Sequence, residues 1–116
     1  MRMQPAADLF KLLADGTRRA LYERLASEGE LNVAALTRGS GISQPAVSQH
    51  LGALKAAGLV ASRPAGRSTY YSASRDGLRP IGEWMHRYAQ FWGERIDALE
   101  QVLKELDRDG DQIDRH

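Results

Sequence analysis

The chain has 116 residues and a mass of 12.9 kDa, which suits one domain and leaves no room for two independent cores. Its composition is that of an ordinary globular protein, with 42% hydrophobic residues, 27% charged residues and a formal net charge of +1. Because cysteine is absent, disulfides, thiolate metal sites, thiol redox sensing and cysteine nucleophiles are excluded. The apolar runs are shorter than the ~18 residues of a membrane span, and no secretory leader precedes Asp8. We therefore expect a cytoplasmic protein with no membrane partner.

The small net charge is an average over unlike segments. Residues 1–40 carry +1, residues 41–79 carry +4 from five basic and one acidic side chain, and residues 80–116 carry −4. A basic middle segment indicates a local surface for a polyanion such as nucleic acid. From charge alone, an uneven solvated surface explains the same pattern equally well.

Three short helices are predicted before residue 40. The first carries the helical apolar pattern Leu9, Phe10, Leu12 and Leu13 and stops at Asp15-Gly16. Thr17 is placed to cap the second helix, and a third helix covers residues 33–37 and ends at Gly39. The following turn contains two glycines, which permit positive φ.

A fourth helix has the best-defined start in the chain. Ser43 suits the N-cap, and Pro45 falls at N2, where its missing amide has no intrahelical partner in any case. Ile42 and Val47 have the spacing of a hydrophobic staple. Val47, Leu51 and Leu54 form one apolar stripe, and the helix is predicted to end near Ala57-Gly58.

A β-hairpin is predicted next, with strands at residues 59–63 and 68–72 joined by a turn at residues 64–67. Two strands are too few for an independent sheet, so the hairpin must pack on the helices. Residues 1–75 are thereby predicted to form a winged helix-turn-helix, mainly α with a small β-hairpin.

A long helix is predicted from Asp76 or Gly77 to about Asp107, with a polar tail at residues 108–116. At ~1.5 Å per residue, its roughly thirty residues span ~45 Å, more than the rest of a small domain can cover. Part of its apolar stripe should therefore be buried against another chain. The predicted interface of this homodimer includes Leu9, Leu12, Met85, Tyr88, Trp92, Ile96, Leu99 and Leu103.

The fourth helix and the hairpin together predict binding to double-stranded DNA. With the apolar stripe inward, the outer face carries few bulky groups, so the helix can lie close to the floor of a groove. Glutamine and serine are side chains that contact base edges, and lysine and arginine suit phosphates. The candidate DNA-binding residues are Gln44, Pro45, Ala46, Ser48, Gln49, His50, Lys55, Arg63, Arg67, Ser68 and Thr69.

His50 has two interpretations of equal weight. It lies roughly 60–70° from the centre of the apolar stripe on a helical wheel. It contacts DNA, or it is a half-buried histidine that is hydrogen-bonded to the third helix.

Four segments together identify a family. They are residues 10–19 (FKLLADGTRR), 43–51 (SQPAVSQHL), 54–60 (LKAAGLV) and 66–71 (GRSTYY). Over residues ~6–107 the chain resembles the ArsR/SmtB family of dimeric winged-helix repressors. This resemblance implies an inverted-repeat operator, a dimer through the first and last helices, the fourth helix in the DNA groove, and a wing around Arg67 at the backbone.

The chain departs from the metal-sensing members of that family. Asn32 and Ala34 stand where the third-helix cysteines of those sensors would be. The resemblance offers only Glu83 and His86 for the interface metal site, which is too few for a four-ligand site. We therefore predict neither a metal nor a cofactor, and a solvated face at Glu83 and His86, as in a non-metal-sensing branch.

Aromatic residues gather in the last predicted helix, at Trp84, Tyr88, Phe91 and Trp92. A stripe of this spacing is usually core or interface. The alternative is an apolar pocket for an unidentified small-molecule effector at the dimer seam.

Two functions of other classes are the alternatives to a DNA-binding repressor. An enzyme is not supported, because no nucleophile has a base at recognisable spacing and no phosphate-binding loop is present. A protein–protein interaction module built on the long helix would bind no DNA, whereas DNA affinity should fall steeply with salt.

Overall fold

The computed structural model describes the backbone of residues 5–114 and the side chains of residues 5–89, 91 and 93–108. The chain divides into two compact units, one up to Glu83 and the other from Trp84 onward. Each unit is described by itself.

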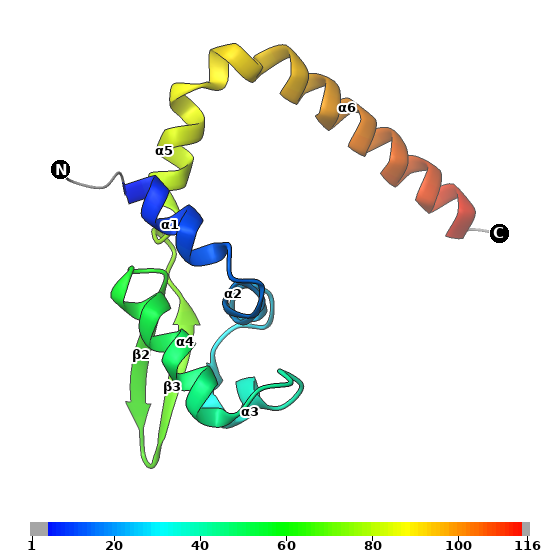
Figure 1. Cartoon of the computed structure of the whole chain (residues 1–116). Helices are drawn as coiled ribbons and strands as arrows, with labels where there is room; N and C mark the ends of the chain where they lie inside the picture. The colour runs from blue at the N-terminus through cyan, green and yellow to red at the C-terminus, as the bar shows by residue number, and fades with distance from the viewer. Residues whose placement is uncertain (1–4, 115–116) are drawn as a thin grey trace. The chain divides into compact units, whose positions relative to one another are not determined.

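The first unit is a winged helix-turn-helix (Figure 1), as the sequence predicts. In chain order its elements are α1 (Pro5–Leu13), α2 (Gly16–Glu28), β1 (Leu31–Asn32), α3 (Val33–Thr37), α4 (Gln44–Ala56), β2 (Val60–Ala65) and β3 (Ser68–Ala73). α3 and α4 form the helix-turn-helix, and β2 and β3 form the wing. The turn between α3 and α4 uses positive φ at Gly39 and Gly41, as expected.

The sheet has three antiparallel strands in the order β1-β3-β2, one more than predicted. The additional strand β1 pairs Leu31 with Tyr71 and Asn32 with Tyr70. The hairpin is therefore held at one edge by a strand that comes from the chain just before α3. Two residues are too few to give an alternating pattern, so the sequence alone did not reveal β1.

The wing turn is tighter than expected. Pro64 and Ala65 belong to β2, where they pair with Thr69 and Ser68, so only Gly66 and Arg67 form the turn. Pro64 is tolerated because β2 is an edge strand. Gly66 has φ 63°, and no non-glycine residue in the described part of the chain has positive φ. A glycine at the first of two turn positions is typical of a type II′ hairpin. This geometry places Arg67 at the tip.

One hydrophobic core joins the helices to the sheet. The apolar stripe of α4 lies at its centre, with Val47, Leu51 and Leu54 all 0% exposed. The rest of the buried cluster comes from α1, α2, α3, β2 and the residue before β2, and comprises Leu9, Leu21, Leu25, Leu36, Leu59 and Val60. Burying a large aliphatic side chain contributes roughly 1.5–3 kcal/mol, so this cluster fixes the position of α4.

Side chains from neighbouring residues cap the helices. Ser43 accepts the amide of Ala46 at the start of α4 (3.3 Å), and Gly58 follows its end with φ 80°, both as predicted. At α2 the prediction was wrong, because Asp15 rather than Thr17 is the N-cap and accepts the amide of Arg18 (3.0 Å). That hydrogen bond lowers the pKa of Asp15.

Arg24 of α2 holds the end of α3 from outside. Its guanidinium donates to three main-chain carbonyl oxygens, those of Ala35 (3.1 Å), Leu36 (3.2 Å) and Arg38 (3.1 Å). Its Nε donates to Glu28 (2.9 Å). The last carbonyls of a helix lack intrahelical hydrogen-bond donors. Here Arg24 of α2 supplies the donors.

The predicted single long helix is wrong in two respects. It is two helices, α5 (Arg79–Arg87) and α6 (Ala89–Asp114), interrupted at Tyr88. The amide of Tyr88 donates to the carbonyl of Met85 (3.1 Å), three residues back, which is a tighter turn than an α-helix makes. α6 also continues to Asp114, beyond the predicted end near Asp107, so residues 108–114 of the predicted polar tail are helical.

The second unit exposes a long apolar surface on α6. Ile96, Leu99, Val102, Leu103 and Leu106 are 40–59% exposed and recur every three or four residues. We call these five residues the α6 stripe. Within residues 5–114, no helix is both long and apolar enough to span a membrane.

Candidate nucleic-acid interface

The outer face of α4 is polar and of low relief. Gln44, Pro45, Ser48 and Gln49 are exposed, while Ala46 is half-buried. Further along the helix, Gly52 and Ala56 add almost no side chain to this face, and Lys55 is exposed near its C-terminus. A helix of this kind can lie close to base edges, with glutamine donors and acceptors reaching from it.

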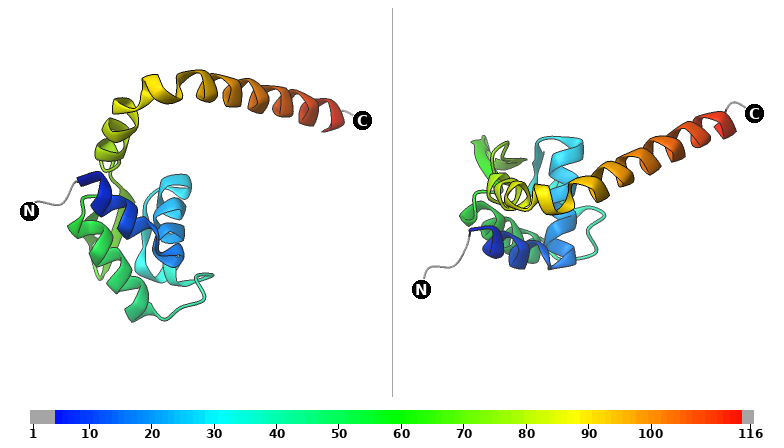
Figure 2. Two further views of the ribbon diagram at one scale, coloured as in Figure 1. Left: turned by 45° about the horizontal axis from the view of Figure 1, so that its top comes forward. Right: turned by 90° about the horizontal axis from the view of Figure 1, so that it is seen from above.

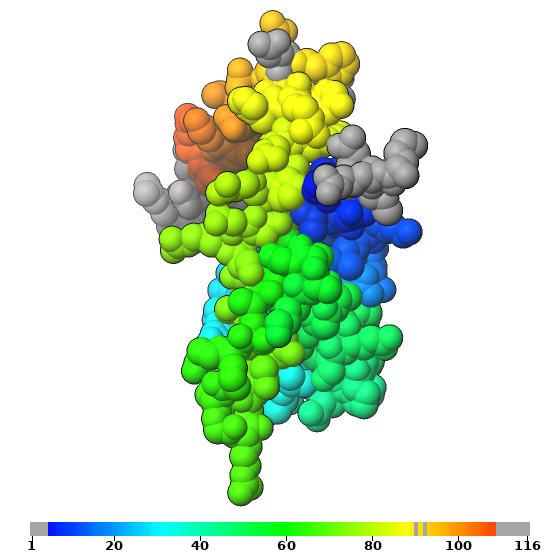
Figure 3. All heavy atoms as spheres, turned by 90° about the vertical axis from the view of Figure 1, so that its left-hand side faces the viewer, coloured from blue at the N-terminus to red at the C-terminus, as the bar shows by residue number. Residues whose placement is uncertain are grey.

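The wing carries a basic residue in its turn. Figure 3 shows the tip of the hairpin projecting beyond the rest of the first unit. Arg67 lies in the two-residue turn at this tip and is exposed. An arginine in this position is free to approach a phosphate group.

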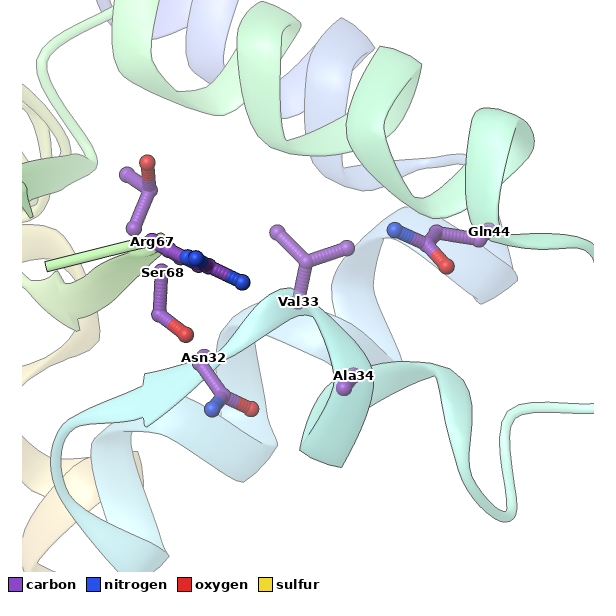
Figure 4. A pocket seen from close by; sticks show the side chains of 7 residues that line it. Asn32, Val33, Ala34, Gln44, Arg67 and Ser68 are labelled. Atoms are coloured by element: carbon purple, nitrogen blue, oxygen red, sulfur yellow. The ribbon is translucent and has the colours of Figure 1, made fainter.

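A groove of about 240 Å³ separates the wing from the helix-turn-helix. Its lining residues are Asn32, Val33, Ala34, Gln44, Arg67, Ser68 and Thr69. Figure 4 shows Arg67 and Gln44 reaching toward Val33 from opposite sides, with Ser68 and Asn32 along one wall. The groove therefore combines one guanidinium with amide and hydroxyl groups, which is a donor-rich setting for a phosphate oxygen.

Three of these lining residues were not among the predicted site residues. Asn32 caps α3 by accepting the amide of Ala35 (2.8 Å), and Val33 and Ala34 begin that helix. An Asn before a short apolar run is an N-cap signal that could have placed the start of α3 beside the wing. These three residues lie beside the wing because β1 pairs with β3, and no local sequence pattern indicates that pairing.

The guanidinium of Arg63 is already engaged within the chain. Its Nη2 and Nε donate to the two carboxylate oxygens of Glu30 (2.7 and 3.1 Å), and it lies 5.2 Å from the ring centroid of Tyr70. Arg63 pairs with Tyr70 across the sheet, and Tyr70 pairs with Asn32, so the side chain spans β3 to reach the start of β1. A DNA phosphate, the predicted partner of Arg63, would therefore compete with the Glu30 carboxylate for its guanidinium.

Those hydrogen bonds from Arg63 lower the pKa of Glu30, and the carboxylate in turn raises the pKa of Arg63. Because the pKa of Glu30 is lowered in the folded state, the ion pair stabilises the fold at pH values above the ordinary pKa of a glutamate carboxyl. This stabilisation is lost as the pH falls through the lowered value.

We expect Glu30→Gln to release Arg63 for DNA. Affinity for a random duplex should rise about two- to threefold at low salt, and the slope of log affinity against log salt should steepen by about 1. Fluorescence anisotropy titrations at several salt concentrations measure both. Glu23→Gln removes the same charge from an exposed residue of α2 and serves as control. An equal change in both variants would show an effect of net charge rather than the release of Arg63.

His50 faces the second helix rather than the third. Its Nδ1 accepts a hydrogen bond from Nε of Arg18 (3.3 Å), and its ring is half-buried. The expectation of a half-buried, hydrogen-bonded histidine was correct in kind, but the predicted partner helix was wrong.

The predicted dimer residues fall into two groups. Leu9 is 4% exposed and Leu12 packs against the core of the first unit, so Leu9 offers almost no surface to a second chain. Met85, Tyr88, Ile96, Leu99 and Leu103 are exposed, and the side chain of Trp92 lies outside the described residues. The surface left for a partner is therefore on α5 and α6 rather than at Leu9.

Glu83 and His86, the remaining metal candidates, are both exposed on α5. Within the described residues, no three or more His, Asp or Glu side chains gather where they could hold a metal ion.

The rings of Trp84 and Tyr88 form a tilted aromatic pair, with centroids 5.0 Å apart and an interplanar angle of 52°.

Comparison with known proteins identifies the family. A family model described as a helix-turn-helix domain matches residues 13–63. The HTH-type transcriptional regulator Rv2034 of Mycobacterium tuberculosis is 43% identical over 102 residues, which cover 88% of this chain and 89% of that protein. The arsenical resistance operon repressor of Escherichia coli K12 is 41% identical over 66 residues, 57% of this chain and 56% of that protein.

A solved structure agrees in both fold and sequence. The ArsR-like transcriptional regulator from Rhodococcus sp. RHA1 matches with a TM-score of 0.66 and 30% identity, over 84% of this chain and 92% of that chain. These similar proteins are regulators, so neither an enzyme nor an interaction module without DNA binding describes the chain. The chain belongs to the ArsR family of winged helix-turn-helix transcriptional regulators and is a DNA-binding protein.

Proposed function

We propose that the chain is a homodimeric repressor that binds an inverted-repeat operator through α4 and the β2–β3 wing. The observation that carries this proposal is the low, glutamine-bearing face of α4 beside a wing whose tip is an arginine. In this arrangement Gln44, Ser48 and Gln49 contact base edges in the major groove. Lys55, Arg67, Ser68 and Thr69 contact the sugar–phosphate backbone.

The α6 stripe supports the dimer. Five partly exposed aliphatic side chains on one helix face favour association with an identical face, and identical chains associate with two-fold symmetry. Two recognition helices related by a two-fold axis match the two halves of an inverted repeat. Repression is inferred from the arsenical resistance operon repressor, to which part of this chain is similar.

Regulation by a third-helix thiolate site is not part of this proposal. Asn32 caps α3 and Ala34 lies in its first turn, at positions that carry no metal-binding side chain. We place the protein in a non-metal-sensing branch, acting in the cytoplasm where its DNA is. For an unidentified small-molecule effector, the place we propose is the aromatic residues of α5 and α6, Trp84, Tyr88 and Phe91.

The proposal predicts different losses from Gln49→Ala and Arg67→Ala. Gln49→Ala should weaken operator binding by about tenfold and leave binding to a random duplex unchanged, because a base contact is lost. Arg67→Ala should weaken both by about tenfold and reduce the salt slope by about 1, because a phosphate contact is lost.

The operator is first selected from a random duplex library with the purified protein, and affinities are then measured by anisotropy. Gln101→Ala and Arg108→Ala, both exposed on α6 on the face opposite the α6 stripe, remove the same groups away from the proposed DNA and dimer interfaces. Equal losses of discrimination from Gln49→Ala and Arg67→Ala would contradict the division between base and phosphate contacts.

A further inference from the structure

The start of α2 is joined to the end of α1 by two adjacent arginines. Nη1 of Arg19 donates to the carbonyl of Leu13 (2.7 Å), and Nη1 of Arg18 donates to the carbonyl of Leu12 (3.5 Å). Both carbonyls belong to the last turn of α1, where intrahelical donors are missing. The arginines thus hold α1 and α2 in a fixed relation.

Arg18 also reaches the recognition helix. Its Nε donates to Nδ1 of His50, 32 residues later in the chain and half-buried on α4 (3.3 Å). In Figure 2, α1 lies beside both α2 and α4 in the two views. One guanidinium therefore connects the last turn of α1 with the helix that carries the candidate base-contacting glutamines.

This hydrogen bond requires one protonation state of His50. An arginine Nε can only donate, so Nδ1 must carry the lone pair and the ring proton must be on Nε2. A proton added to Nδ1 removes the acceptor and places a second positive charge beside Arg18. The carboxylate of Asp15, three residues before Arg18, accepts the main-chain amide of Arg18 (3.0 Å).

We propose that Arg18 and His50 are a positioning pair that sets how α4 lies against α1 and α2, and that loss of their hydrogen bond weakens operator selection. The inference rests on the proposed role of α4 in operator recognition. It makes His50 a positioning residue and not a DNA ligand, and it gives α1 a direct connection to the recognition helix.

The pair is tested by operator and random-duplex affinities of the wild type, His50→Asn and His50→Leu. Asn offers Oδ1 near the position of Nδ1, whereas Leu offers no acceptor. His50→Leu should lower the ratio of operator to random affinity about tenfold, the loss expected for one charge-assisted hydrogen bond. His50→Asn should keep the wild-type ratio.

Arg18→Lys and the double variant Arg18→Lys/His50→Leu complete the design. If the two residues act as one pair, the double variant loses no more discrimination than either single variant. His86→Asn, at an exposed histidine of α5, is the matched control and should discriminate like the wild type. Imidazole ¹⁵N shifts of His50 provide a measurement without DNA, and should show the Nε2–H tautomer at high pH.

Each other outcome overturns the pair. If His50 contacts phosphate, His50→Asn weakens operator and random binding alike. An Nδ1–H tautomer, additive losses in the double variant, or an unchanged ratio in His50→Leu would likewise refute it. If the wild type showed no preference for any selected duplex, the proposed function itself would fail, and the ¹⁵N shifts would still report on the pair.

Discussion

Replacing Leu103 by glutamate is expected to separate the proposed homodimer into monomers and to weaken operator binding by about a hundredfold or more, because each monomer then binds one half-site without the gain from the second. Leu103 is 50% exposed within the α6 stripe, between Leu99 at 58% and Leu106 at 59%. A carboxylate buried in such an apolar contact lacks a partner and is strongly unfavourable.

The matched control is Gln101→Glu. It adds the same charge two residues away, on the face of α6 opposite the stripe. Light scattering at micromolar concentration measures the mass, and anisotropy with the selected operator measures the affinity. A dimeric Leu103→Glu variant, or equal effects of both substitutions, would contradict a dimer through the α6 stripe.

The largest stability loss is expected from Leu51→Ala, at about 2–5 kcal/mol of the free energy of unfolding. Leu51 lies on the inner face of the recognition helix α4 and is 0% exposed at the centre of the core. Removing its side chain leaves a cavity where α4 meets the rest of the first unit. Urea unfolding of wild type and variant at equal protein concentration measures the difference.

Leu78→Ala removes the same group from a residue that is 39% exposed and serves as control. It should cost about 1 kcal/mol or less, since most surface substitutions lie near that range. A loss from Leu51→Ala no larger than that of the control would mean that α4 is not held by the core described above.

The parts of the fold with local signals could be predicted from the sequence. In α4 the cap at Ser43, the early Pro45 and the apolar stripe lie within one segment, and the structure agrees with each. The wing was predicted from its turn residues, although Pro64 and Ala65 continue the strand.

The parts that depend on distant residues could not be predicted. β1 has only two residues and exists because Tyr70 and Tyr71 pair with them. Since β1 was missed, so was the ion pair that its neighbour Glu30 makes with Arg63 across the sheet. Arg63 was therefore counted among the free cations of the wing.

The interruption at Tyr88 illustrates a second limit. The apolar pattern continues from α5 into α6 without a proline, so periodicity alone predicted one helix. The apolar pattern indicates which residues share a helix face. It does not indicate where the backbone changes locally to an i to i−3 hydrogen bond, such as that from the amide of Tyr88 to the carbonyl of Met85.

The contact of Arg24 with the end of α3 has a consequence for the order of folding. α3 has five residues, far below the ~12 at which an isolated helix becomes even marginally stable. Its terminal carbonyls are bonded by a side chain that comes 11 to 14 residues earlier in the chain. The first helix of the DNA-binding motif therefore depends on α2 for the partners of its terminal carbonyls, and we do not expect it to form before α2 is in place.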